Sequence, residues 1–470
     1  IERERAVAEQ ERQRSDEVAR FLAGLFKLSD PSEARGREIT AKEILANRAE
    51  RIEREMANQP QTQATMMETI GRVYLALDQG ELARPQIEGS LARRRVLFPG
   101  DHLDVASSLG AAGELELNAG RVEAAEQFHR SALAMYERLN QRDNIAVAET
   151  LQGLGQVLKV KGDARGAREA LERSLYLFTS LSGSDSTRVS SVLNELAQLE
   201  SQQARYAEAE RLYRRALAIE ERILGPDAPQ VIYSQHNLAD TLKHQGKLEE
   251  AGPLYVQSIA QLKKVMGEKH GATIDALGNY GRYLQDSGDL AGAERVMREA
   301  LTLNREMRGE SHFTVGYHLV NLGDLLRMRG DLAGAEQALN QALAIYGATF
   351  PEENLYSASA HAKRARVMID SGRPREALAA ADRALTIREH ELQAGHMQIA
   401  EARALRGRSL TLLKQHDAAR EALQRSVEEL SSGAAQADWR AARMREEATQ
   451  WLAQLNGSGS AEPKPPPPAN

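Results

Sequence analysis

The sequence repeats one pattern of small residues nine times, with a period of 42 residues that never slips. The pattern centres on a column, position 0, that holds Gly120, Gly162, Gly246, Gly288, Gly330 and Gly372, with Asp78, Ala204 and Lys414 in the other copies. Alanine stands at position +5 in all nine copies. Every copy also has Gly or Ala at −7, Ser or Ala at +12 and an aliphatic residue at +13. Five columns in one register predict an array of helical repeats.

Helix packing explains why these columns need small residues. Positions −7, +5 and +12 are expected where two helix backbones approach too closely for a branched side chain. Position 0 fits the end of a helix, where a left-handed residue costs least as glycine. Each copy is therefore predicted to be a helix, a tight turn and a second helix. One second helix should span about 206–224 before Gly225-Pro226, and the next first helix should run from Pro229 to Gln245.

The order of these columns resembles the tetratricopeptide repeat, whose basic unit has 34 residues. The longer copies here, and passages such as residues 209–255, are similar to the repeats of kinesin light chains, and Pro85 and Pro253 share position +7. The resemblance covers roughly residues 60–455. It implies an all-α fold: a right-handed α-solenoid of nine 42-residue helix-turn-helix repeats with helical caps at both ends. It also implies a scaffold that binds a protein or peptide, without specifying which one.

The sequence divides into five predicted segments. Residues 1–28 form a charge-dense, juxtamembrane-like helix, and 29–59 form an N-terminal cap whose helix begins with a capping box at Thr40–Glu43. Residues 60–435 hold the nine repeats. Residues 436–455 form a capping helix in the place of a tenth first helix. The Gly/Ser/Pro-rich tail, 456–470, is expected to be disordered.

A second resemblance concerns the segment FLAGLFKLSDPSEARGREITAKEIL, residues 21–45. It is similar to the stretch after the membrane helix in bacterial serine/threonine kinases that carry C-terminal tetratricopeptide repeats. The resemblance implies a sensor or docking region on the extracytoplasmic side of a membrane-anchored parent; without it, the cytoplasm is the expected compartment. The chain begins at Ile1 and contains no glycine-rich phosphate loop, HRD or DFG motif. We therefore expect a non-enzymatic part of a longer protein.

Composition excludes several other functions. The 61 basic and 67 acidic residues give a net charge of −6 without a basic stripe, which argues against nucleic acid as a partner. The absence of cysteine excludes disulfides, thiol catalysis and zinc–thiolate sites. No apolar run is long enough to predict a membrane span. Four histidines share position +24 and lie 42 or more residues apart: His102, His270, His312 and His396. They are expected to cap helices rather than to bind one metal together. No cofactor is expected.

The candidate site follows from the family resemblance, because first helices line the concave groove in such repeats. Amides in a ladder can bond an extended peptide backbone, and Tyr and Arg often anchor interfaces. The predicted groove residues are Gln152, Gln156, Asn194, Gln198, Tyr233, His236, Asp240, Lys243, Arg282, Tyr317, Arg327 and Arg366. The alternative for each is an ordinary solvated side chain. For the whole chain, the alternative to a binding module is self-association, with residues 1–28 forming a homodimer contact.

Overall fold

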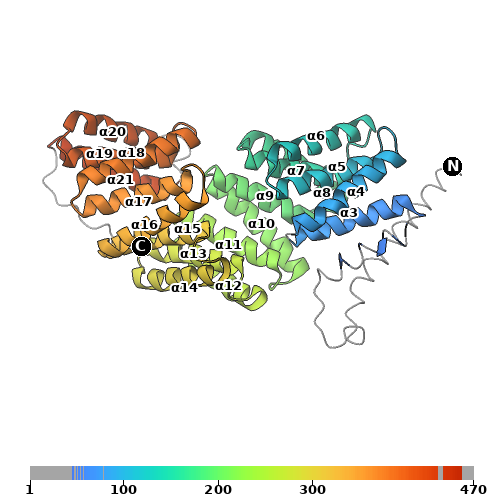
Figure 1. Cartoon of the computed structure of the whole chain (residues 1–470), viewed down its shortest axis with the longest axis horizontal. Coiled ribbons are helices and arrows are strands. Elements are labelled where there is room, and N and C mark those ends of the chain that lie inside the picture. Colours follow the sequence, from blue (N-terminus) through green and yellow to red (C-terminus); the bar gives the residue numbers. More distant parts are fainter. Residues whose placement is uncertain are drawn as a thin grey trace. The chain divides into compact units, whose positions relative to one another are not determined.

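The computed structural model describes residues 58–77, 79–431 and 438–457, together with scattered positions between 45 and 56. Within this part of the chain there are nineteen α-helices and no strand, as Figure 1 shows. The helices follow one another as nine pairs and a final single helix. The all-α repeat array predicted from the 42-residue period is therefore confirmed. The charged segment 1–28, most of the 29–59 cap, Asp78 and nearly all of the 456–470 tail lie outside the described residues.

The chain forms two compact units that divide between Leu199 and Glu200. The helices of unit 1, in pairs, are α3 (Pro60–Ala76) and α4 (Gly80–Leu97), α5 (Leu103–Asn118) and α6 (Val122–Arg138), and α7 (Ile145–Val160) and α8 (Ala164–Ser182). The next helix, α9 (Thr187–Gln202), contains the boundary itself.

Unit 2 continues the same alternation of first and second helices. They are α10 (Tyr206–Leu224), α11 (Pro229–His244), α12 (Leu248–Met266), α13 (Gly271–Asp286), α14 (Leu290–Arg308), α15 (Phe313–Met328), α16 (Leu332–Thr349), α17 (Leu355–Asp370), α18 (Pro374–Glu391), α19 (Met397–Leu412), α20 (His416–Leu430) and α21 (Trp439–Leu455). Odd numbers up to α19 are first helices and even numbers are second helices. The predicted bounds near 206–224 and 229–245 agree with α10 and α11 to within one residue.

The position 0 column adopts the left-handed backbone that the glycines predicted. All six glycines have φ between 68° and 92°, and the two described exceptions, Ala204 and Lys414, keep φ at 55° and 62°. The N–H at +1 then bonds the carbonyl at −4, as from Asp331 to Leu326 at 2.9 Å. These are the contacts of a Schellman-type helix end, so position 0 ends each first helix.

The small-residue columns mark the contact between the two helices of a repeat. A Cβ on Gly155, at −7, would lie 2.6 Å from the Leu171 side chain at +9 and 3.4 Å from the Ala167 carbonyl at +5. Serines at +12 donate across the same contact: Ser174 Oγ bonds the Ala148 carbonyl at 2.7 Å. The columns are thus small because the paired backbones touch there.

The four histidines at position +24 cap first helices. His102, His270, His312 and His396 each accept a hydrogen bond from the backbone N–H two residues on. Such a bond satisfies one of the free N–H groups of a helix start. The capping interpretation of this column is confirmed.

Replacing Ala293 with leucine should destabilise the protein. Ala293, at +5 on α14, is fully buried in a cluster with Met297 and Val315. Extra methylenes in such a contact cost about 1–3 kcal/mol. Leucine at Glu208, whose side chain is 42% exposed and pairs with Arg211, should cost about 0.5 kcal/mol or less. Urea unfolding of both variants checks this, and equal small losses would contradict the repeat register.

Candidate functional site

Polar side chains at positions −13, −10, −6, −3 and −2 of the first helices form one set, which we call the first-helix face. In unit 1 its predicted members are Gln152, Gln156 and Asn194, which are half-buried, and Gln198, which is exposed. Gln152 Nε2 donates to Ser191 Oγ at 2.8 Å, and Gln156 Nε2 donates to Glu195 Oε1 at 2.8 Å. Both bonds run from α7 to α9, so neighbouring first helices are joined through their amides.

On α11 the carboxylate of Asp240 contacts three side chains. Tyr255 donates its hydroxyl proton to Asp240 Oδ1 at 2.9 Å, Lys243 forms an ion pair with the same oxygen, and His244 Nε2 lies 3.6 Å from Oδ2. Burial would raise the pKa of Asp240, but the charges of Lys243 and His244 hold it well below its ordinary range. Burial lowers the pKa of Lys243 to about 8, against the effect of Asp240. Because Lys243 is fully buried, a ligand can contact it only after the groups that cover its side chain have moved.

The other two predicted residues of α11 differ in exposure. Tyr233 is 40% exposed and remains available to a ligand. His236 is half-buried, with Nε2 3.1 Å from Asn279 Nδ2 and its ring edge-on to Tyr255. Burial lowers the pKa of His236 to about 4, so the ring is neutral at pH 7. Tyr233 is therefore the surface contact of this helix, and His236 joins α11 to α13.

From α11 to α17 the charges at position −6 alternate, as Asp240, Arg282, Asp324 and Arg366, and α19 continues the position with a second arginine, Arg408. Arg282 Nη1 donates to the Tyr317 hydroxyl at 3.2 Å. Asp324 accepts from Arg327 at 3.3 Å on its own helix and pairs with Lys363 on α17 at 2.8 Å. Each charge is thus fixed by a partner on the same or the next first helix.

Arg327 and Arg366, the last predicted residues, also bond carboxylates. Arg327 Nη1 donates to Asp370 Oδ2 at 2.9 Å. Arg366 Nη1 donates to both carboxylate oxygens of Glu447 at 3.0 Å, and Glu447 belongs to α21. From the sequence, this helix was expected only to cap the repeats, and its contact with Arg366 was not foreseen. The spacing of α21 could have indicated the contact: α21 begins 42 residues after α19, in the position of a further first helix.

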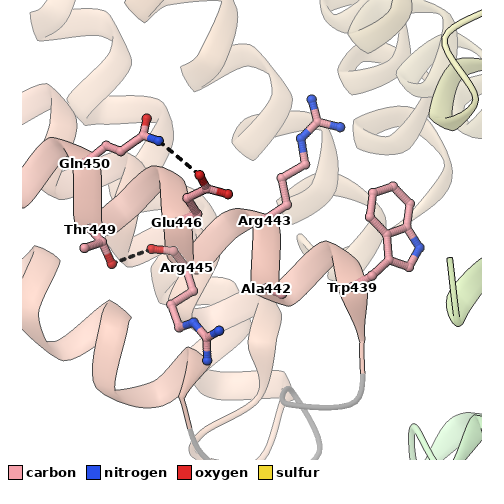
Figure 2. A pocket seen from close by; sticks show the side chains of 7 residues that line it. All are labelled: Trp439, Ala442, Arg443, Arg445, Glu446, Thr449 and Gln450. Atoms are coloured by element: carbon pink, nitrogen blue, oxygen red, sulfur yellow. Dashed lines mark hydrogen bonds between the residues drawn. The ribbon is translucent and has the colours of Figure 1, made fainter. Parts of the chain in front are cut away.

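A hollow of about 620 Å³ lies along one side of α21. It is lined by Trp439, Ala442, Arg443, Arg445, Glu446, Thr449 and Gln450, which Figure 2 shows on the helix. Gln450 donates to Glu446 at 3.4 Å within this lining. The lining combines the Trp439 ring, Ala442 and the aliphatic parts of long side chains with charged and amide groups.

Within the part of the chain that the structure describes, no group of three or more His, Asp or Glu side chains is placed to hold a metal ion. No helix among these residues is long and apolar enough to cross a membrane.

Sequence and structure comparisons agree with this repeat geometry. A family model for the tetratricopeptide repeat matches residues 62–138, 146–222, 188–264, 230–306 and 283–348. No curated protein matches the chain. Among solved structures, the apo form of RapI covers 83% of this chain and 98% of its own, with 12% identity and a TM-score of 0.56.

Two further solved structures are similar. A Rap protein complexed with competence and sporulation factor covers 84% of this chain and 99% of its own, at 12% identity and TM-score 0.50. A putative kinesin light chain of Podosopora anserina covers 43% of this chain and 96% of its own, at 22% identity and TM-score 0.37. Such identities show shared fold alone. The matched repeats extend over more than half of the sequence, and the chain belongs to the tetratricopeptide-repeat family.

Proposed function

We propose that the chain is a non-catalytic scaffold whose first-helix face binds a protein or peptide segment. The observation that carries this proposal is the alternating, fixed charge at position −6 across α11, α13, α15 and α17. Side chains held in place before binding lose little conformational freedom when a ligand arrives. Opposite charges on successive repeats favour one register of a ligand over others.

An exposed residue near these charges supplies a contact for the ligand: Tyr233 on α11 is 40% exposed. Tyrosine is a common anchor because it offers a large rigid ring and a hydroxyl with few rotatable bonds. The solved Rap protein complexed with competence and sporulation factor supports a binding role for this type of fold.

The resemblance of residues 21–45 extends the proposal: the scaffold would be the sensor or docking region of a bacterial membrane serine/threonine kinase. Self-association through residues 1–28 is the alternative, and both segments lie almost entirely outside the described residues. Molar mass measured with and without residues 1–38 separates the two, because a dimer that persists only with this segment supports self-association.

Peptides selected from a random library on the immobilised full chain should depend on the first-helix face. We expect Tyr233→Ala and Arg282→Ala each to weaken binding of the selected peptides by about 2 kcal/mol, roughly 30-fold. Arg214→Ala is the control, since Arg214 is exposed on the second helix α10 and pairs with Glu210 and Glu250. Isothermal titration measures each affinity. The proposal is wrong if Arg214→Ala weakens binding as much as the other two.

A further inference from the structure

The last helix, α21, is held by two different kinds of contact. One side packs as a tenth first helix would, with Ala441 buried in a small cluster beside Ala400 and Leu430. Trp451 lies against the alanine cluster of α17 to α19. These apolar contacts are the ones expected of a helix that caps the last repeat.

The N-terminal end of α21 contacts α10, α11 and α13, which lie far away in sequence. Trp439 Nε1 donates to the Lys243 carbonyl on α11 at 2.7 Å, and Arg440 forms an ion pair with Asp286 on α13. The residue before the helix, Asp438, accepts from the Tyr206 hydroxyl at 3.1 Å. A helix that only capped the stack would need none of these three contacts.

The middle and end of α21 contact the same face through charge and amide groups. Glu447 pairs with Arg366, and Arg408 Nη1 donates to Gln454 at 3.1 Å. The helix therefore presents a basic residue to the acidic Asp286 and an acidic residue to the basic Arg366. Its charges are thus opposite to those of the two first-helix residues that they contact, Asp286 at position −2 and Arg366 at position −6.

Little apolar burial holds α21 in this place. Only Ala441 and Ala448 are buried among its 17 residues, whereas α19 has ten buried residues out of 16. The Arg440–Asp286 and Glu447–Arg366 ion pairs, whose side chains are 14–37% exposed, therefore carry much of its attachment. The hollow lined by Trp439 and Arg443 lies along the other side of the helix (Figure 2). A competitor with the same contacts can therefore displace α21 without unfolding the stack.

We propose that α21 occupies, within the chain, the place of a partner helix on the first-helix face of unit 2. The partner is a helical protein segment with an aromatic–arginine pair in its first turn and a glutamate two turns later, like Trp439, Arg440 and Glu447. This inference rests on the proposed function and specifies its ligand. In the free chain α21 already contacts two residues predicted as ligand contacts: Trp439 bonds the backbone carbonyl of Lys243, and Glu447 pairs with Arg366.

The test uses a fluorescent synthetic peptide of residues 438–455 as the probe, added to the full chain. In the variant Arg440→Ala/Glu447→Ala the internal helix loses both charge contacts, while its buried alanines stay. We expect this variant to bind the probe at least tenfold more tightly than the wild type, because a tethered competitor acts at millimolar effective concentration. The matched control is Arg445→Ala/Glu446→Ala, which removes the same two residue types from α21 and should bind the probe like the wild type.

Adding Asp286→Asn to the Arg440→Ala/Glu447→Ala variant, called here the loosened variant, locates the binding site of the probe. The probe should then bind at least fivefold more weakly, because its own arginine loses the acidic partner. In the wild-type chain, excess probe should also raise the hydrogen-exchange rate of α21 amides, and this readout needs no substitution. Equal probe binding to wild type and loosened variant, no effect of Asp286→Asn, or unchanged exchange in α21 would each overturn the inference. If library-selected peptides still depend on Tyr233 while the probe fails, the proposed function stands and only this inference falls.

Discussion

Replacing Arg94 with methionine is expected to lower the free energy of unfolding by about 3–5 kcal/mol. Arg94 on α4 is buried and forms an ion pair with the buried carboxylate of Glu68 on α3. It also donates to the Ser108 hydroxyl at 2.8 Å and to the Asp104 carbonyl at 2.9 Å on α5. Without Arg94, Glu68 stays buried with a weaker set of partners. The loss is large because a buried charge has no water to replace its partner.

Urea unfolding measures this loss, and two further variants show its origin. Arg94→Met combined with Glu68→Met should recover much of the stability, because apolar groups can replace a buried ion pair at little cost. Arg165→Met is the control, since Arg165 pairs with Glu169 on the open surface and should change stability by less than about 0.5 kcal/mol. A loss below about 1 kcal/mol for Arg94→Met would show that the pair is not buried as described.

The repeat architecture could be predicted from sequence because its signals are local. Position 0 needs a left-handed residue, and glycine fills that need in six copies. Ala204 and Lys414 adopt the same backbone without being glycine, so only the neighbouring columns revealed their place. A period that fixes backbone conformation and helix contact in each copy leaves little freedom in the fold.

The first-helix face could be predicted only in part. The polar positions of α7 to α17 were found because they recur at fixed distances from position 0. The burial of Lys243 was not foreseen, and neither was the hydrogen bond from Trp439, 196 residues further along the chain, to its backbone carbonyl. Contacts of this range depend on the rotation accumulated from one repeat to the next. The spacing of the columns does not encode that angle.

A buried histidine leads to the second large effect, which concerns pH. His129, at +9 on α6, is fully buried, and neither ring nitrogen has a hydrogen-bond partner among the described residues. Glycines make room for it: a Cβ on Gly113 would lie 2.6 Å from Nε2, and one on Gly153 would lie 2.5 Å from Cε1. Burial, with a smaller effect of the Arg72 charge, lowers the pKa of His129 from 6.5 to about 4.

Because the folded pKa lies below the unfolded value, the unfolded chain binds more protons between pH 6.5 and about 4. The contribution of His129 to stability should therefore be constant above pH 6.5 and fall as the pH drops through this window. Position +9 holds leucine in three other repeats, as Leu171, Leu339 and Leu423, so His129→Leu removes the titrating group and keeps a side chain that the site accepts. We expect the wild type to lose about 1–2 kcal/mol more than His129→Leu between pH 7 and pH 5 in urea unfolding. Other buried histidines, such as His318, titrate in both proteins and cancel in the comparison. The pKa of Glu68 is lowered, so the stability that its carboxylate contributes is lost only below this pH range. The difference between the two proteins therefore reports on His129. Parallel pH profiles for the two proteins would mean that His129 is not held neutral between the glycines.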